Sequence, residues 1–244
     1  MPLLALPFLL LSLLDDSPET ALEHARIVNL ERAAALPNFV VDETATRFKS
    51  RHVNPPKWEL FDTVESELAV RGSGFTRENV RRNGKPWQKP DLSDFNWGIG
   101  FGAGLHQVFS PKCPTILEFQ GREEVGEKQL LAYRFLSPPD GCFATFTING
   151  KQHNPAETGR VLIEDPGGAV VYFETVAREF PKGFGADPYT FAMKWDYVKI
   201  GDASHLLPVS AEIFGGFVRG DLWHVVVEFK NHRHFEASTK VTYQ

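Results

Sequence analysis

His232 and His234 lie two residues apart and could supply two ligands of a metal site. If their segment is a strand, both imidazoles lie on one face, because side chains two residues apart share a face. A zinc ion needs three or four ligands, and no acid or cysteine nearby offers a recognisable spacing. The remaining histidines are scattered singly along the chain. We therefore expect a polar strand face here, no metal site, and no cofactor.

Two further groups could suggest catalysis. The glycine-rich residues 98–104 resemble a phosphate loop, but they follow no apolar strand and lack both the G-x-G-x-x-G register and a following Lys-Ser/Thr. Glu65 and Glu67 are spaced like an acid pair, yet they share their strand face with Thr63 and Arg71, which indicates a solvated face. No G-x-S-x-G elbow is present. The sequence thus predicts a protein that is not an enzyme.

A basic cluster surrounds the dipeptide at residues 83–84, an Asn-Gly pair that strongly favours a hairpin turn. Its members are Arg77, Arg81, Arg82 and Lys85. We interpret it as a solvated hairpin tip, with contact to a phosphate-rich surface as the alternative. The formal net charge of the whole chain is −5, which argues against a nucleic-acid partner.

Aromatic and aliphatic residues on several expected strands share a periodicity that points inward. The candidate ligand-binding residues are Trp58, Leu60, Val64, Leu68, Phe173, Met193 and Trp195, with Trp97 on a glycine-rich flap over the sheet. If the sheet is an open barrel, part of this surface would line a cavity, because ligand pockets are mostly apolar. The alternative is a closed core that binds nothing.

The elements that position these residues are mostly strands. Residues 57–71 alternate apolar and polar side chains, which is typical of an antiparallel sheet with one buried face. Residues 159–180 form two apolar runs around a Pro-Gly-Gly turn, and strands are expected at 189–200, 206–214 and 222–229, with a last one over 234–243. A helix begins after Ser17 and ends before Pro37. The pattern predicts a mainly β (α+β) fold: an N-terminal helix packed on a strongly curved antiparallel sheet, an unclosed β-barrel of about 10–11 strands, in a single domain over residues 17–244.

The N-terminus begins with a 14-residue apolar run that is short for a membrane span. We interpret residues 1–16 as a signal peptide, although no basic residue precedes the run and no A-x-A-like site follows it. The alternative is a buried N-terminal helix. Export predicts a periplasmic or secreted protein with no transmembrane span in the mature chain.

The chain has two cysteines, Cys113 and Cys142, at the outer ends of an expected hairpin with glycines near its tip. If the two strands pair, the cysteines approach each other at the open end, and we expect a disulfide there. The alternative is a pair of buried free thiols, since the bond requires an oxidising compartment.

The order of these elements resembles a known family. The relevant phrases are LPNFV, FDTVESELAV, RRNGKP, GRVLIEDPGGAVVYFE, LLPVSAEI and VEFKNHRHFEASTKV. Together they resemble uncharacterised exported bacterial proteins whose layout is similar to the lipoprotein-localisation (LolA/LolB-like) carrier superfamily, including related periplasmic sensor domains. The resemblance implies an unclosed barrel around helices with an apolar cavity, and a hydrophobic ligand or a lipoprotein acyl chain as partner. A partner-binding or sensory envelope protein with a solid core remains the alternative, and an envelope hydrolase is a third.

Overall fold

The chain builds a large antiparallel sheet that curves around two helices. The structure is a computed structural model. It describes residues 17–52, 55–72, 74–88, 90, 103–143, 145–148, 150–180, 188–216 and 221–235. The elements are α1 (Pro18–Ala34), β1 (Phe39–Ser50), β2 (Glu59–Arg71), β3 (Gly74–Arg82), β4 (Lys85–Pro86), α2 (Ala103–Phe109), β5 (Ile116–Val125), β6 (Lys128–Ser137), β7 (Phe146–Ile148), β8 (Lys151–His153), β9 (Glu157–Glu164), β10 (Val170–Ala177), β11 (Tyr189–Ile200), β12 (Ala203–Gly216) and β13 (Leu222–His234).

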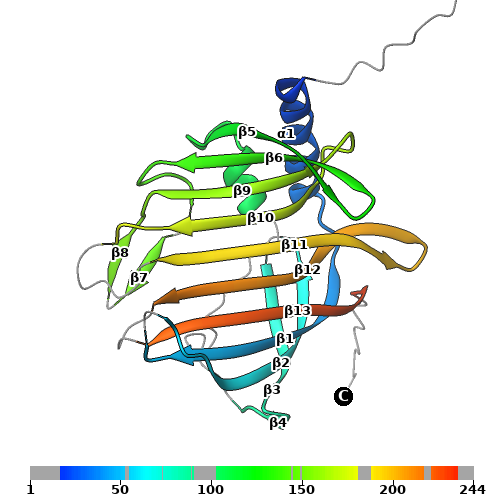
Figure 1. Cartoon of the computed structure of the whole chain (residues 1–244). Coiled ribbons are helices and arrows are strands. Elements are labelled where there is room, and N and C mark those ends of the chain that lie inside the picture. Colours follow the sequence, from blue (N-terminus) through cyan, green and yellow to red (C-terminus); the bar gives the residue numbers. More distant parts are fainter. Residues whose placement is uncertain are drawn as a thin grey trace, which may run out of the picture.

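Eleven strands form the sheet, in the order β4-β3-β2-β1-β13-β12-β11-β10-β9-β6-β5 (Figure 1). The strands pair in an antiparallel manner with their neighbours, and β7 pairs with β8 in a separate small ribbon. The two edges, β4 and β5, do not meet, so the sheet is an unclosed barrel. The predicted fold class, including the helix and the strand count, is confirmed.

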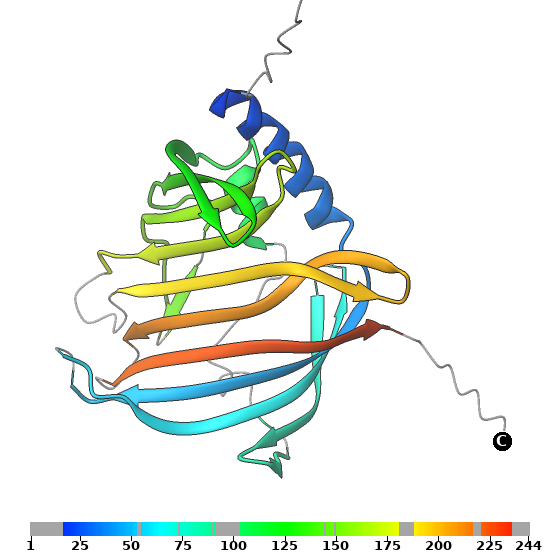
Figure 2. The same ribbon diagram turned by 45° about the vertical axis from the view of Figure 1, so that its right-hand side comes forward.

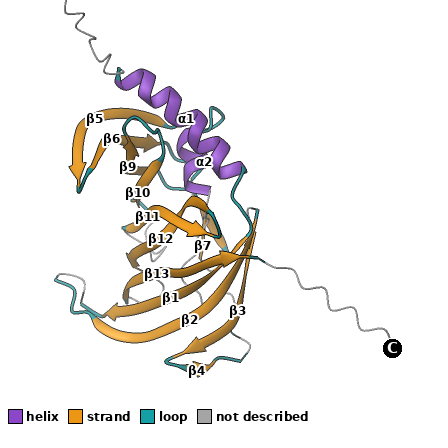
Figure 3. Ribbon diagram, turned by 90° about the vertical axis from the view of Figure 1, so that its right-hand side faces the viewer, coloured by secondary structure: helices purple, strands orange, loops and turns teal. Residues whose placement is uncertain are grey.

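The curvature gives the sheet an inner face and an outer face. Helices α1 and α2 lie on the concave inner side, toward the β5–β10 end, whereas the tip of the β5–β6 hairpin projects on the opposite side (Figure 3). The view in Figure 2 shows β1–β3 curling back under the rest of the sheet. Most of the buried apolar side chains belong to one core cluster between the helices and the inner face.

Helix α1 begins as its sequence predicts, and buried hydrogen bonds anchor it to the sheet. The side chain of Ser17 accepts a hydrogen bond from the Thr20 amide at 3.3 Å, and proline occupies the first turn. Further along, the fully buried Asn29 donates to the Gly168 carbonyl at 2.8 Å and accepts from the Val170 amide at 3.0 Å. These bonds attach the helix to the turn between β9 and β10, so the predicted 159–180 hairpin is also the attachment point of α1.

The predicted turns are present at both main hairpins. Asn83 and Gly84 have φ values of 51° and 74° between β3 and β4, as a two-residue Asn-Gly turn requires. Gly126, with φ 63°, connects β5 to β6.

Several predictions fall on residues outside the described ranges. These are the signal peptide at residues 1–16, Trp97 and most of the glycine-rich flap at residues 91–102, and the last strand beyond residue 235. No helix in the described part of the chain is long and apolar enough to cross a membrane.

Candidate functional site

The structure separates the predicted ligand-binding residues into two groups. Five of them lie in the core on the inner face, each at most 6% exposed: Val64, Leu68, Phe173, Met193 and Trp195. All five belong to the main hydrophobic core cluster, and Met193 and Trp195 are also among the residues that line the larger hollow described below. The ring of Phe173 packs within this core: it stacks at 5.5 Å on Phe135, and a Cβ atom at Gly104 in α2 would lie 3.4 Å from it.

Trp58 and Leu60 do not face the interior, and that part of the prediction is wrong. Their side chains are 36% and 63% exposed. The register between β1 and β2 shifts after Arg47↔Asp62 to Phe48↔Leu60, which leaves Phe61 as an extra residue. Such a bulge reverses the alternation beyond it. Because the prediction assumed unbroken alternation, it placed these two residues on the wrong face.

Trp58 instead contributes to an aromatic patch on the outer face. The Trp58 ring lies 5.7 Å from Phe214, edge to face, and 5.5 Å from His224. His224 in turn stacks on Phe48 at 5.7 Å. The patch therefore joins β12, β13 and β1 to the segment that precedes β2.

Beside this patch the outer face is hollowed by a groove of about 870 Å³. We call it the outer groove. Its apolar lining residues include Val125, Leu130, Leu162, Val171, Tyr172, Ala192 and Val226. Val125 lies on the β5–β6 hairpin, whose tip projects over this face (Figure 3), while the others come from β6 and β9–β13. The volume is within the usual range of about 300–1,000 Å³ for small-molecule sites.

A second hollow of about 410 Å³, the end pocket, adjoins the outer groove. Its lining is Pro56, Trp58, Tyr172, Glu174, Thr190, Ala192, Glu212, Phe214 and His224. Tyr172, Ala192 and Glu212 belong to both linings, so the two hollows meet at these residues. The combined site extends from the Trp58 patch to the β5–β6 hairpin.

The charges of the two hollows differ. Lysine and arginine side chains occur only in the outer groove, as Lys128, Arg160 and Lys194. Lys128 lies 2.9 Å from Glu164, and Arg160 forms an ion pair with Glu123. Among the residues that the structure describes around the end pocket, the acidic side chains are Glu174 and Glu212, and no lysine or arginine balances them within its lining.

Hydrogen bonds fix the two carboxylates of the end pocket. The Tyr172 hydroxyl donates to Oε2 of Glu174 at 2.7 Å, and Nε2 of His224 lies 2.6 Å from Oε1 of Glu212. Burial raises the pKa of Tyr172 well above its usual range, with the bond to Glu174 and the charges of Glu174 and Glu212 acting in the same direction. The phenol therefore senses the negative charge of both acids.

A second cluster of charges lies buried on the inner face of β1–β3. Nε and Nη2 of Arg47 each donate at 2.6 Å to one oxygen of Asp62, and Nε of Arg82 donates at 2.6 Å to Oδ2 of the same residue. Arg77 donates from Nε and Nη2 to Glu43, at 2.8 and 3.0 Å. The expectation of a wholly solvated hairpin tip is thus wrong for Arg77 and Arg82, which pair with buried acids.

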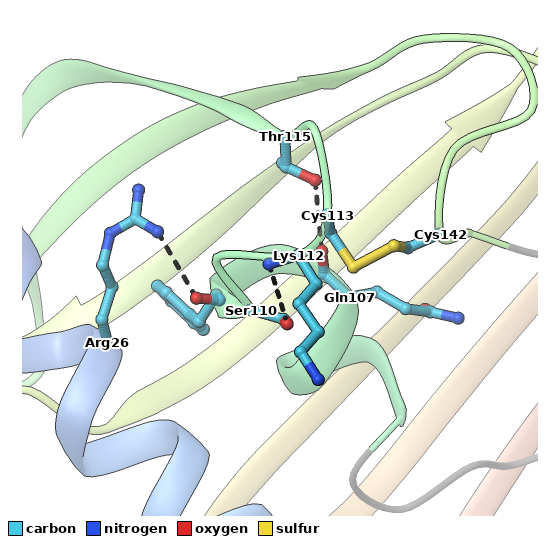
Figure 4. The surroundings of a disulfide bond; sticks show 8 residues. Arg26, Gln107, Ser110, Lys112, Cys113, Thr115 and Cys142 are labelled. Carbon is cyan, nitrogen blue, oxygen red and sulfur yellow. Dashed lines mark hydrogen bonds between the residues drawn. A yellow bond between two sulfur atoms is a disulfide. The ribbon is translucent and has the colours of Figure 1, made fainter.

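The cysteines lie at the open end of the β5–β6 hairpin, as predicted (Figure 4). Their sulfur atoms are at disulfide distance, with Cα atoms 5.5 Å apart. The loop on the Cys113 side is held by hydrogen bonds to the end of α2, including Thr115 Oγ1 to the Gln107 carbonyl at 3.1 Å. The pair therefore connects the segment after α2 with the segment after β6.

The remaining candidates occupy strand surfaces. His232 Nε2 lies 3.0 Å from the Pro208 carbonyl, and Glu67 forms an ion pair with Arg233, while Glu65 is exposed. Within the described ranges, no group of three or more His, Cys, Asp or Glu residues is arranged to hold a metal ion.

Comparisons with known proteins concern the fold only. No family model and no curated protein matches the chain. Among solved structures, it is similar to the LolA superfamily protein NE2245 from Nitrosomonas europaea, with a TM-score of 0.37 and 8% identity over 94% of this chain and 98% of that one. It is also similar to a DUF1329 family protein from Desulfovibrio piger ATCC 29098, with a TM-score of 0.40 and 7% identity over 91% and 95% of the two chains. The first neighbour belongs to the superfamily that the order of elements resembles.

Proposed function

We propose that the protein is a non-enzymatic binding protein of the cell envelope that holds a hydrophobic ligand, such as a lipid or an acyl chain, in the outer groove. The observation that supports this is the groove itself, about 870 Å³, whose lining includes apolar side chains from β6 and β9–β13 with charged residues among them. An acyl chain would cover Leu130, Leu162 and Val226, and the release of water from these surfaces would drive binding. The site differs from the inner cavity that the LolA-like resemblance implied, since the inner-face residues pack as a core.

The envelope location rests on two features of the chain. The pairing of Cys113 with Cys142 suits an oxidising compartment such as the periplasm. The apolar N-terminal run suits an export signal.

Titration calorimetry with n-alkyl maltosides of eight to twelve carbons, below their micelle concentrations, tests the proposal. Each added CH₂ group should raise the affinity about fourfold, because burial of one CH₂ contributes about 0.8 kcal/mol. Ala192→Trp should abolish binding, since Ala192 lies where the two hollows meet. The matched control is Thr44→Trp, because Thr44 lies on the outer face of the sheet, on β1, but lines neither hollow. This variant should bind as the wild-type chain does. No binding by the wild-type chain would overturn the proposal.

A partner-binding role with a solid core is the second candidate. The observation that favours it is the close packing of the inner face, together with exposed apolar side chains on the edge strand β5, where Ile116 is 60% and Val125 54% exposed. An edge strand with such residues can pair with another chain. Ile116→Lys should then abolish capture of a partner and leave alkyl maltoside binding unchanged.

A further inference from the structure

We propose that the end pocket binds an ammonium group, primary or quaternary, so that the ligand of the outer groove is an amphiphile with a cationic nitrogen. This inference rests on the proposed function, because it names the head group of the ligand whose apolar part occupies the groove. It concerns the residues around Glu174 and Glu212, to which the sequence assigned no role.

Charge is the first argument. The end pocket has two carboxylates in its lining and no lysine or arginine. Glu174 is held by the Tyr172 hydroxyl at 2.7 Å and Glu212 by His224 at 2.6 Å, so both are oriented before a ligand arrives. An anionic head group would be repelled here, whereas a cation gains two charge partners.

The aromatic walls are the second argument. Trp58, Tyr172 and Phe214 all line the end pocket, and the rings of Trp58 and Phe214 meet edge to face at 5.7 Å. A cation is attracted to the negative face of an aromatic ring, most strongly that of tryptophan, and a quaternary ammonium loses little hydration when it leaves water. Aromatic rings with acidic groups select an organic cation over a metal ion, which would need more oxygen ligands.

The connection between the hollows is the third argument. Tyr172, Ala192 and Glu212 line both, so a nitrogen in the end pocket places an attached chain at the mouth of the outer groove. Lys194 and Arg160 line the groove and not the end pocket, although their strand register places them opposite Tyr172 and Glu174. The two hollows therefore suit the two ends of one molecule.

Three decyl amphiphiles separate the head-group claim from the proposed function. Decyltrimethylammonium should bind the wild-type chain at least tenfold more tightly than decyl maltoside, and decyl sulfate should bind most weakly. In the double variant Glu174→Gln/Glu212→Gln, decyltrimethylammonium should fall to the affinity of decyl maltoside, whose own affinity should stay unchanged. Glu228→Gln is the matched control, since Glu228 lies on the same face and lines neither hollow.

The outcomes are distinguishable. If decyl maltoside binds as tightly as decyltrimethylammonium, the cation site is refuted while the proposed function stands. Tetramethylammonium, which has no chain, tests the end pocket alone: it should shift the indole resonance of Trp58 in the wild-type chain and not in the double variant. A shift by tetramethylammonium without any amphiphile binding would keep the cation site and refute the apolar groove, and no shift would refute the cation site.

Discussion

The inner face of this sheet has two halves with opposite chemistry. On β6 and β9–β11, beneath α1 and α2, it is mostly apolar, and the rings of Phe135, Phe143 and Phe173 stack with centroids 5.1 and 5.5 Å apart. The buried carboxylate on these strands, Glu157, accepts a hydrogen bond from the Thr175 hydroxyl at 2.6 Å. On β1–β3 the same face buries charge, and the exposed fractions of Glu43 and Asp62 are 1% and 2%. Both halves are buried, so burial alone does not decide the residue type.

The difference follows from how each half provides hydrogen-bond partners for its buried polar atoms. In the apolar half, stacked rings and aliphatic side chains leave few polar atoms to satisfy. In the charged half, each carboxylate accepts several bonds from arginine, and Glu43 accepts a further one from Ser66 at 2.7 Å. Aromatic rings complete this half: Phe61 lies 5.4 Å from the guanidinium of Arg47 and 5.2 Å from that of Arg82. A buried charge is tolerated only when it is paired and hydrogen-bonded, so this half should be the more sensitive to a single deletion.

Asp62→Ala should cause the largest loss. It removes the carboxylate that two arginines share, and breaking a buried ion pair from one side costs about 3–5 kcal/mol of unfolding free energy. Urea denaturation measures the loss. The matched control is Asp196→Ala, whose side chain is 64% exposed and lies 3.6 Å from Lys128, and which should change stability by less than about 0.5 kcal/mol. Equal losses of unfolding free energy in the two variants would mean that the buried ion pairs of Asp62 contribute no more to stability than an exposed one.

Trp195→Ala tests the apolar half and should cost about 3–4 kcal/mol. The side chain is 6% exposed, and the guanidinium of Arg32 lies 5.7 Å from its ring, so the variant loses apolar burial and a cation–π contact together. Desolvation by burial lowers the pKa of Arg32 to about 10. Trp58→Ala is the comparison, because its ring lies on the outer face, and it should cost less than about 1 kcal/mol. A large loss for Trp58 would restore the interior position that its strand alternation first predicted.

Asn29→Ala should lower the unfolding free energy by about 2–3 kcal/mol, and it tests how firmly helix α1 is attached to the sheet. Its side chain is fully buried in the mostly apolar half and bonds the Ala25 and Gly168 carbonyls and the Val170 amide. Removal leaves buried backbone groups without these bonds, and each costs its desolvation energy. Thermal unfolding measures the change, with Gln129→Ala, an exposed residue that bonds Glu124, as the control. If both variants melt alike, Asn29 does not anchor α1.

The strands could be predicted from the sequence, but the one-residue shift in the pairing of β1 with β2 could not. The bounds of β11 and the hairpins at Asn83 and Gly126 follow from local alternation and turn chemistry, which short segments already encode. The bulge at Phe61 is set by how β1 and β2 pair, a long-range choice, and it moves Trp58 and Leu60 to the outer face. The end pocket was missed for the same reason, since Glu174 and Glu212 belong to strands that are not neighbours and converge only once the sheet forms.

The charged half was also beyond local reasoning. Asp62 and Ser66 alternate with Val64 and Leu68 on one face of β2, and this pattern was available in the sequence as a polar interruption of an apolar face. The pattern could not show which cations pair with the buried acids, because Arg77 and Arg82 belong to a hairpin that was expected to be solvated. A buried acid in a strand is a reason to expect a cation on the neighbouring strand.

His232 should give the smallest effect, and a pH-dependent one. Its ring lies 5.8 Å from Phe39, and burial lowers its pKa below the usual 6.5, although the Pro208 carbonyl and Asp42 oppose the shift. The unfolded chain therefore binds a proton at a higher pH than the folded chain, and unfolding free energy should fall as the pH drops below about 6.5. His232→Gln keeps an N–H that can reach the Pro208 carbonyl and removes the titration, so its stability should fall less between pH 7 and 5 than that of the wild-type chain. Lys230→Gln, a nearby exposed variant that does not titrate in this window, should keep the wild-type slope. If His232→Gln also keeps that slope, burial of this ring does not couple folding to protons.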